Sequence, residues 1–423
     1  MSSVVIAGDT SGTVTLAAPA VAGSTTLTLP ATTGNIVTDT ATQTLTNKTL
    51  TSPTIGSSGI TFSDGSTQTA AASPYVLKNR IINGACVIAQ YGTTSLTVDN
   101  TAVKYGVDRM AAYGNIAASK FTVQQNAGSV TPPVGYTKYL GATSSSAYAV
   151  AATDVFYVYQ RIEGFNIADL AWGTANAKTI TLSFQVYSSL TGTFGGSIAN
   201  GGETRSYAFS YSIPTANTWT TISVTIPGDT SGTWTSDNTA GMEVNFSLGA
   251  GTSRSGTANT WTASMLYQPT GATSVVGTSG ATWYVTGVQL EIGSTATTFE
   301  RRLYNQELAN CQRYYYNYVN AALGVANPIG ISANFSTTRV FTVVKYPVTM
   351  RTTPTISATG GTGYYAIYYN GTVTGSNVAP FLSSASPESY TLEFTPASAV
   401  TLNAAGFTQT SGVGGFISFT AEL

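Results

Sequence analysis

Histidine is absent from this 423-residue chain, and charged residues make up only 8% of it. Without an imidazole there can be no Ser-His-Asp or Cys-His pair and no histidine-ligated zinc site. A net charge of −1 provides no basic field for nucleic acid or anionic lipid, so neither is expected as a partner. No apolar run reaches the ~18 residues that a membrane helix needs, so membrane insertion is not expected.

The chain also has few cysteines and no recognisable export signal. Cys86 and Cys311 are the only two thiols, too few for a disulfide framework. We expect both to be free and partly buried, with a single bridge between them as the alternative. The first residues hold no basic segment followed by an apolar one, so no secretory signal is expected there.

Small, hydroxylated and aromatic residues are abundant instead. Besides many Thr, Ser and Asn, the chain has 43 Gly and 25 Tyr. β-branched Thr and aromatic Tyr favour pleated strands, whereas Gly favours turns. Apolar and polar residues alternate along residues 179–187, 219–226 and 242–248, which is the period of a half-buried strand. The sequence therefore predicts an all-β protein built on an antiparallel β-sandwich.

Residues 1–75 are a low-complexity segment of short strand-like pieces. Leu45, Leu50 and Ile55 are spaced five apart, which is not the period of a core strand. A single copy would bury too little surface to offset an ordering cost of about 1–2 kcal/mol per residue. Three copies wound together would bury more, so we expect an extended shaft or attachment segment of a homotrimer. A disordered linker is the alternative.

The rest of the chain is expected to hold two β domains. Residues 76–300 carry most of the strand signals and form the sandwich. Residues 319–423 form a smaller, tyrosine-rich β domain, which we expect to be the distal tip. Its strands are expected near residues 339–344, 364–369, 390–394 and 415–420, the last of which ties the chain end into a sheet.

Residues 301–318 connect the two domains and concentrate charge in a chain that otherwise has little. Tyr304, Leu308 and Cys311 have the spacing of one face of a short helix within residues 299–314. Ion pairs between three adjacent subunits would explain the clustered charge, and a solvated helix is the alternative. The candidate inter-subunit residues are Glu300, Arg301, Arg302, Glu307 and Arg313.

Several short motifs, in their order along the chain, resemble those of bacteriophage tail fibres and receptor-binding proteins. The first is similar to a recurring N-terminal fibre segment. Those that follow are similar to parts of a jelly-roll domain, its hinge and the terminal domain. The position after Asp108-Arg109 is often Trp in the family and is Met110 here. The motifs are residues 46–55, Asn79-Arg80-Ile81-Ile82-Asn83-Gly84, Gln90-Tyr91-Gly92-Thr93, Asp108-Arg109, Tyr159-Gln160-Arg161-Ile162-Glu163-Gly164, Gly287-Val288-Gln289-Leu290-Glu291-Ile292-Gly293, Phe299-Glu300-Arg301-Arg302, Cys311-Gln312-Arg313-Tyr314-Tyr315 and residues 346–355.

The resemblance implies a homotrimer whose main domain is a jelly roll similar to carbohydrate-binding modules. It implies a protein of the virion tail, assembled in the host cytoplasm and bound through its N-terminus to a phage tail or baseplate protein. Its function would be attachment to the host cell surface, by multivalent binding of a bacterial surface glycan or protein receptor. A purely structural virion appendage or decoration protein, and a polysaccharide depolymerase spike, are the alternatives.

Receptor contacts are expected among the tyrosines of the last domain. Tyr rings stack on sugars and their hydroxyls form hydrogen bonds, although sheets also use Tyr as ordinary cross-strand packing. Glycines on one side and Asn370-Gly371 on the other predict that one tyrosine group lies near a loop tip. The candidate glycan contacts are Tyr364, Tyr365, Tyr368 and Tyr369.

Enzymatic activity is not expected. Paired carboxylates are the one catalytic route left, and no acid lies in a recognisable catalytic motif, so no catalytic residue and no cofactor is assigned. Asp108-Arg109 and residues 160–163 place opposite charges near strand ends. We interpret these as structural salt bridges, with a ligand or ion site as the alternative. Jelly rolls of this kind often hold a structural calcium ion, whose ligands here are not assigned.

Overall fold

The computed structural model describes residues 3–7, 11–17, 59–61, 67–68, 78–320, 325–411 and 414–423. The chain divides into two compact units, Met1–Ala72 and Ser73–Leu423. In the first, β1 (Ser3–Ala7) pairs antiparallel with β2 (Thr13–Ala17), and β3 (Ile60–Thr61) with β4 (Thr67–Gln68). Most of the expected shaft, including residues 46–55, lies outside the described residues.

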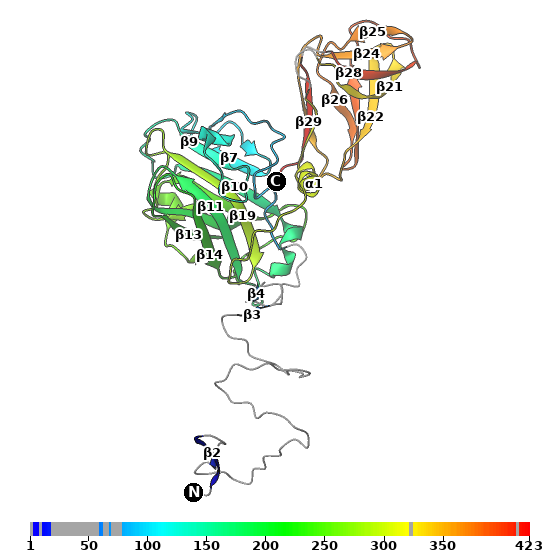
Figure 1. Ribbon diagram of the computed structural model, residues 1–423. Coiled ribbons are helices and arrows are strands. Elements are labelled where there is room, and N and C mark those ends of the chain that lie inside the picture. The colour runs from blue at the N-terminus through cyan, green and yellow to red at the C-terminus, as the bar shows by residue number, and fades with distance from the viewer. Residues whose placement is uncertain are drawn as a thin grey trace. The chain divides into compact units, whose positions relative to one another are not determined.

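Strands dominate the second unit, which confirms the all-β prediction (Figure 1). Its N-terminal part contains two antiparallel sheets. In order, the seven-stranded sheet is β17 (Trp261–Thr262), β13 (Ser206–Ile213), β12 (Gly192–Asn200), β15 (Ala240–Ala250), β10 (Val155–Glu163), β7 (Met110–Gly114) and β6 (Lys104–Val107). The six-stranded sheet is β14 (Thr220–Ile226), β11 (Ile180–Ser188), β19 (Thr282–Ile292), β9 (Leu140–Ser144), β8 (Phe121–Gln125) and β5 (Leu96–Val98).

Both sheets contribute to one apolar core, so this part is a β-sandwich. Phe184 of β11 packs edge-on against Phe246 of β15, with 5.0 Å between ring centroids. The indole N–H of Trp283 donates a 2.9 Å hydrogen bond to the Tyr211 hydroxyl across the core. The alternating segments predicted from the sequence became β11, β14 and β15, because one face of each contributes to this core.

The last part, residues 315–423, is referred to here as the terminal domain. Its three-stranded sheet is β20 (Tyr315–Asn320), β29 (Phe416–Thr420) and β23 (Thr355–Ala358). Its seven-stranded sheet, the terminal sheet, is β25 (Thr372–Gly375), β24 (Tyr365–Tyr369), β28 (Ala405–Thr410), β21 (Pro328–Ser336), β22 (Arg339–Lys345), β27 (Ser389–Phe394) and β26 (Phe381–Ala385). The chain end is paired through β29, as predicted.

Helical structure is sparse in the described residues. The one α-helix there is α1 (Tyr304–Gln312). Short 3-10 turns span Ala127–Ser129, Gly164–Asn166, Ala168–Leu170 and Thr252–Arg254. The parallel pair of β16 (Ser255–Gly256) and β18 (Gln268–Pro269) completes the described elements.

Both cysteines are free and buried, which confirms the expectation of unpaired thiols. Burial in an apolar setting raises the pKa of Cys86 to about 12, so this thiol is un-ionised at neutral pH. Among the described residues, no helix is long and apolar enough to span a membrane. No cluster of three or more metal-ligating side chains occurs in the same part of the chain.

Candidate functional site

Helix α1 is anchored to the sandwich through its first turns. It begins at Tyr304, five residues later than the predicted range, because the preceding residues bind the sandwich: the Glu300 amide donates to Gln289 Oε1 at 2.7 Å. Its buried residues are Glu307 and Cys311, whereas Tyr304 is exposed. The predicted apolar face is therefore wrong at Tyr304. Its place is taken by Glu307, whose carboxylate accepts a hydrogen bond from the Asn83 amide.

Motifs that are far apart in the sequence converge beside α1. Asn79 Oδ1 accepts hydrogen bonds from the amides of Ile81 and Leu290, both at 3.0 Å, and Asn79 Nδ2 donates to the Val288 carbonyl. Gln160 makes paired 2.8 Å bonds with the Ile82 backbone, accepting from its amide and donating to its carbonyl. These bonds satisfy buried amides and carbonyls along an irregular segment, which explains why polar residue types recur there.

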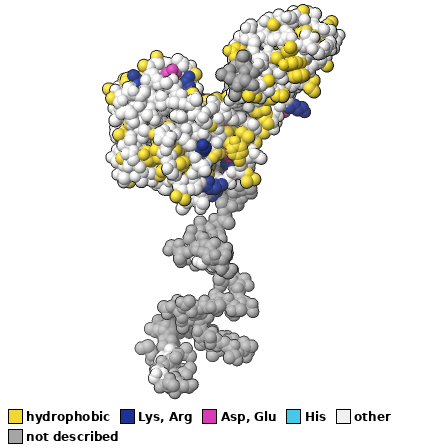
Figure 2. Space-filling model, turned by 45° about the horizontal axis from the view of Figure 1, so that its top comes forward, with side chains coloured by type: hydrophobic (Ala, Val, Ile, Leu, Met, Phe, Trp, Pro, Cys, Tyr) yellow, Lys and Arg dark blue, Asp and Glu magenta, His cyan; other side chains and the backbone are white. Residues whose placement is uncertain are grey.

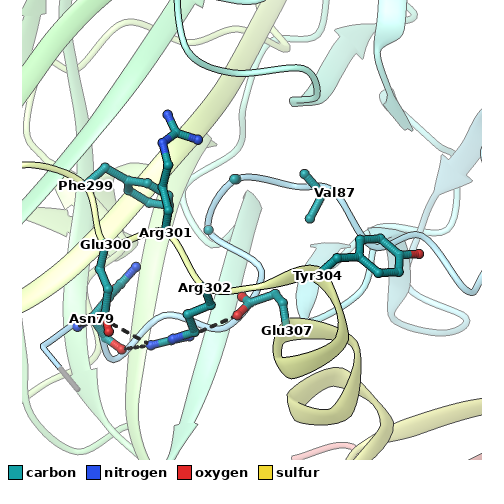
Figure 3. A pocket seen from close by; sticks show the side chains of 10 residues that line it. Asn79, Val87, Phe299, Glu300, Arg301, Arg302, Tyr304 and Glu307 are labelled. Atoms are coloured by element: carbon teal, nitrogen blue, oxygen red, sulfur yellow. Dashed lines mark hydrogen bonds and ion pairs between the residues drawn. The ribbon is translucent and has the colours of Figure 1, made fainter. Parts of the chain in front are cut away.

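Arg302 lies at the centre of this network (Figure 3). Its guanidinium donates to the carbonyls of Asn79 and Ile81 and pairs with Glu307 at 3.3 Å and with Glu300 at 3.7 Å. Glu300 in turn accepts a 2.6 Å hydrogen bond from the Asn79 amide. We call Asn79, Asn83, Glu300, Arg302 and Glu307 the hinge cluster. It fixes α1 to the sandwich within one chain.

Glu163 provides a second ionic connection, between β10 and the residues that follow α1. It is buried and binds Arg313 through two bonds of 2.5 and 2.9 Å. Its carboxylate also accepts a 2.7 Å hydrogen bond from the Tyr314 hydroxyl. The interpretation of residues 160–163 as structural salt bridges is therefore supported: Glu163 pairs with Arg313, and Arg161 pairs with Glu203 and Glu243.

The turn between β6 and β7 makes a third connection. Arg109 pairs with Glu422, and its guanidinium lies 3.7 Å from the centroid of the Tyr314 ring. Asp108 accepts hydrogen bonds of 2.6 and 2.5 Å from the backbone and side chain of Gln90. Gln90 also donates to the Tyr315 carbonyl at the start of β20. Burial raises the pKa of Asp108 to about 6.

These contacts add partners within one chain to the residues that are predicted to form inter-subunit ion pairs. Glu300, Arg302, Glu307 and Arg313 have ionic partners within their own chain, and those partners account for the clustered charge. Arg301 is different, because it is exposed and lies over the rings of Tyr136 and Phe299, at 4.9 and 5.7 Å from their centroids. A role between subunits stays a prediction for all five residues.

Two pockets flank Asn79 and Arg302. The first, of about 180 Å³, has mostly apolar walls, to which Val87, Phe299 and Tyr304 contribute (Figure 3). The second, of about 270 Å³, is lined by amides, guanidinium groups, one carboxylate and the rings of Phe165 and Tyr314, and we call it the polar pocket. Its lining residues are Asn79, Arg80, Ile82, Glu163, Phe165, Asn166, Arg302, Asn310, Arg313 and Tyr314.

The charges of the polar pocket are balanced. Arg80 pairs with Asp169 at 2.6 Å, Arg302 with the acids of the hinge cluster, and Arg313 with Glu163. Every guanidinium of the pocket therefore already faces a carboxylate, and no arginine of its lining is left as an unpaired cation. The carboxylate of Glu163 is held by an arginine and a hydroxyl, which suits a structural acceptor better than a catalytic acid or base.

Phe165 gives the polar pocket an exposed aromatic ring. It follows Gly164 at the end of β10, and 61% of its surface is accessible. Its amide donates to the Asp237 carbonyl at 2.9 Å. A Cβ on Gly164 would lie 2.5 Å from the Thr235 carbonyl oxygen, so only glycine allows this close approach. Sequence reasoning missed Phe165; its one signal was a lone aromatic directly after the Glu163-Gly164 motif.

The four candidate tyrosines do not share one environment. Tyr365 and Tyr369 are buried in the terminal domain, so neither ring can meet a ligand in this conformation. They point inward because alternate residues of β24 face the core. Tyr364 and Tyr368 stay partly exposed, and Tyr368 stacks on Phe407 with centroids 4.6 Å apart. The structure therefore brings together only part of the predicted set, and two candidates remain.

No family model matches the chain, and no curated protein matches it. Among solved structures, the enzymatically active domain of tailspike protein 4 of bacteriophage CBA120 is 11% identical over 51% of this chain, with a TM-score of 0.26. The match spans only 21% of that tailspike chain.

Two further matches are carbohydrate-binding module structures. A CBM4 structure is 13% identical over 50% of this chain and 98% of its own, with a TM-score of 0.24. The other is a family 11 carbohydrate-binding module from Clostridium thermocellum, in complex with a β-1,3-1,4-mixed-linked tetrasaccharide. It is 13% identical over 49% of this chain and 99% of its own, with a TM-score of 0.24. All of these likenesses are remote and carry no functional weight.

Proposed function

We propose that this chain is a non-enzymatic subunit of a phage tail fibre or spike, which attaches the virion to the host cell surface by binding glycans. The observation that carries the proposal is the polar pocket, where balanced hydrogen-bonding groups surround an exposed aromatic ring. The volume of about 270 Å³ is slightly below the ~300–1,000 Å³ of most small-molecule sites, which favours a ligand of one sugar ring.

The lining chemistry favours a neutral, hydroxyl-rich ligand. Amides of Asn166 and Asn310 provide donors and acceptors of the kind that sugar hydroxyls need. Phe165 offers an apolar face on which the C–H side of a sugar ring can pack. An acidic sugar is disfavoured, because each arginine is already paired and Glu163 would repel a second carboxylate.

In this proposal the sandwich carries the receptor site and three copies act together. Residues 1–75 attach the trimer to a tail or baseplate protein, and residues 319–423 form the far end, where Tyr364 is a further candidate contact. Three weak sites on one rigid particle, and several particles on each virion, give avidity without a tight single contact.

The test is glycan-array binding by the full chain and its Phe165→Ala and Asn310→Ala variants. We expect wild type to bind a subset of neutral bacterial glycans, and each variant to lose about tenfold or more in affinity, because a stacking or hydrogen-bonding group is removed. Leu402→Ala is the matched control, since Leu402 is an exposed apolar residue away from the pocket.

Two results would overturn the proposal. Wild-type protein that binds no glycan would favour a purely structural appendage. Binding that survives both pocket substitutions would place the receptor site elsewhere. Release of reducing sugar from the bound polysaccharide, measured in parallel, would contradict the non-enzymatic part of the proposal and favour a depolymerase.

A further inference from the structure

Three adjacent strands of the terminal sheet, β21, β22 and β28, carry exposed apolar side chains on their outward face, although the inward face of the sheet already packs on the apolar core of the domain. On β21, Ile331 and Phe335 point outward and are 82% and 60% exposed. Between them, Ser332 and Asn334 point inward and are buried. A sheet with one solvated face normally shows the opposite pattern, polar side out and apolar side in. Both the exposed apolar side chains and the buried polar side chains of this strand depart from that usual pattern.

The two neighbours of β21 repeat the inversion. On β22, Val343 is 68% exposed and Thr342 is buried; on β28, Phe407 is exposed and Thr408 is buried. The hydroxyls of Thr342 and Thr408 hydrogen-bond to each other at 2.9 Å inside the domain. This bond fixes the two threonines inward and therefore fixes the apolar residues outward. A shift of one residue in register would break it.

The outward residues line up across five adjacent strands. Ile331 pairs with Phe407, Phe407 with Tyr368, and Tyr368 with Val373 in the strand registers. The register of Ser332 with Thr342 places Val343 beside Ile331. We call these five residues the apolar row: Val343, Ile331, Phe407, Tyr368 and Val373.

A flanking pair of rings extends the apolar surface. Phe335 stacks on Phe341 with centroids 5.0 Å apart. Four strand spacings of about 4.8 Å and four residues of about 3.4 Å give an area of roughly 260 Å² in projection. A standard interface buries about 800 Å² on each partner, around a core that is more apolar than its rim. The apolar row is therefore large enough to be such a core.

The charge pattern indicates what covers this face. Its central ions, Arg339 and Glu393, pair with each other through two bonds of 2.6 and 2.7 Å, so they need no ion from a partner. Figure 2 shows charged side chains to be sparse over the described surface of the terminal domain. A sugar would lose hydrogen bonds against isoleucine and valine side chains. Apart from this pair and Lys345 at the end of β22, the described residues of the face carry no exposed ion beside the apolar row, so a second copy of the same apolar face is the partner whose chemistry matches it.

We propose that the apolar row is the surface through which three copies of this chain meet, with their terminal sheets turned toward a common axis. The inference rests on the homotrimer of the proposed function and names the surface that forms it. Ile331, the most exposed residue of the row, would be buried at the contact. The buried polar residues of the sheet then face the interior of their own subunit. The apolar row on the other side of the same sheet faces the neighbouring subunits.

The experiment compares the mass of the full-length chain with that of its Ile331→Lys and Val343→Lys variants by light scattering. We expect a trimer for wild type, and a rise in the dissociation constant of more than about tenfold for each variant, because a lysine ammonium would be buried unpaired. Val134→Lys is the control, since Val134 is fully exposed in a loop of the sandwich.

Circular dichroism spectra show whether each variant is folded, and glycan binding by the monomeric variants separates this inference from the proposed function. A folded Ile331→Lys monomer that still binds glycan with single-site affinity supports both. Folded variants that stay trimeric overturn the interface and leave the glycan site untouched. Trimeric variants that lose glycan binding would show that the face is a receptor surface, which also overturns the inference.

Discussion

Gly84 shows at the scale of one residue why the motif of residues 79–84 ends in glycine. Its carbonyl accepts a 2.9 Å hydrogen bond from the Val288 amide, which draws the turn against β19. A Cβ at this position would lie 2.1 Å from the Val288 carbonyl oxygen. Glycine is required here by backbone proximity, and not by an interaction with a ligand.

Gly84→Ala is therefore expected to lower the free energy of unfolding by about 1–3 kcal/mol, because the backbone must move to relieve the overlap. Chemical denaturation measures the change. Gly202→Ala is the control, since a Cβ there meets no atom within 4 Å. Equal stability of the two variants would mean that the turn does not approach β19 as closely as described.

Phe165 is a pocket residue whose position could not be predicted from the sequence. The sequence predicts contacts at the tyrosines of residues 364–369 because these aromatic residues lie between turn signals. Alternate positions of a strand must face the core, however, and Tyr365 and Tyr369 do so. Phe165 had no aromatic neighbour in the sequence. Its partners Asn310 and Arg313 come from α1 and the residue after it, about 150 positions away, and only the fold joins them.

At the scale of elements, the sequence was informative wherever a strand was half-buried. Residues 179–187 and 219–226 alternate with their apolar side toward the core, so period and burial agree, and β11 and β14 formed as predicted. Residues 328–336 also alternate, and no strand was predicted there. The alternation of β21 cannot reveal which side is buried, because Ile331 and Phe335 face outward although Ile329 is buried.

The connection between the β6–β7 turn and β20 makes stability depend on pH. Burial raises the pKa of Asp108 to about 6, above the ~3.9 of an unfolded chain, so the folded state binds this proton more tightly. The stabilisation is fully present below pH ~3.9 and is lost as pH rises through about 6. Between these limits, Asp108 should reduce the free energy of unfolding by roughly 2–3 kcal/mol.

Urea unfolding of wild type and Asp108→Asn at a series of pH values checks this. Since the amide does not titrate, the difference in stability between the two proteins should change by that amount between pH 4 and pH 6. Leu402→Ala is a control for effects of substitution that involve no titrating group, because Leu402 is an exposed apolar residue. Parallel pH profiles for wild type and Asp108→Asn would contradict the assignment.

At the scale of the whole molecule, the few charges of the chain have a consistent use. Pairs from Arg302, Arg313 and Arg109 join the sandwich to α1 and to the residues around it, and little charge is left for the outer faces. Surfaces without charge do not repel a second copy, which suits a protein that works in several copies. Avidity in the proposed attachment depends on that copy number.

The molar mass of purified full-length chain, measured by light scattering, tests this central claim most directly. Three copies held on a common axis predict a mass three times the 43.7 kDa of one chain, unchanged on moderate dilution. A mass of 43.7 kDa at every concentration would contradict threefold display, and with it the account of how weak glycan sites could hold a virion to its host.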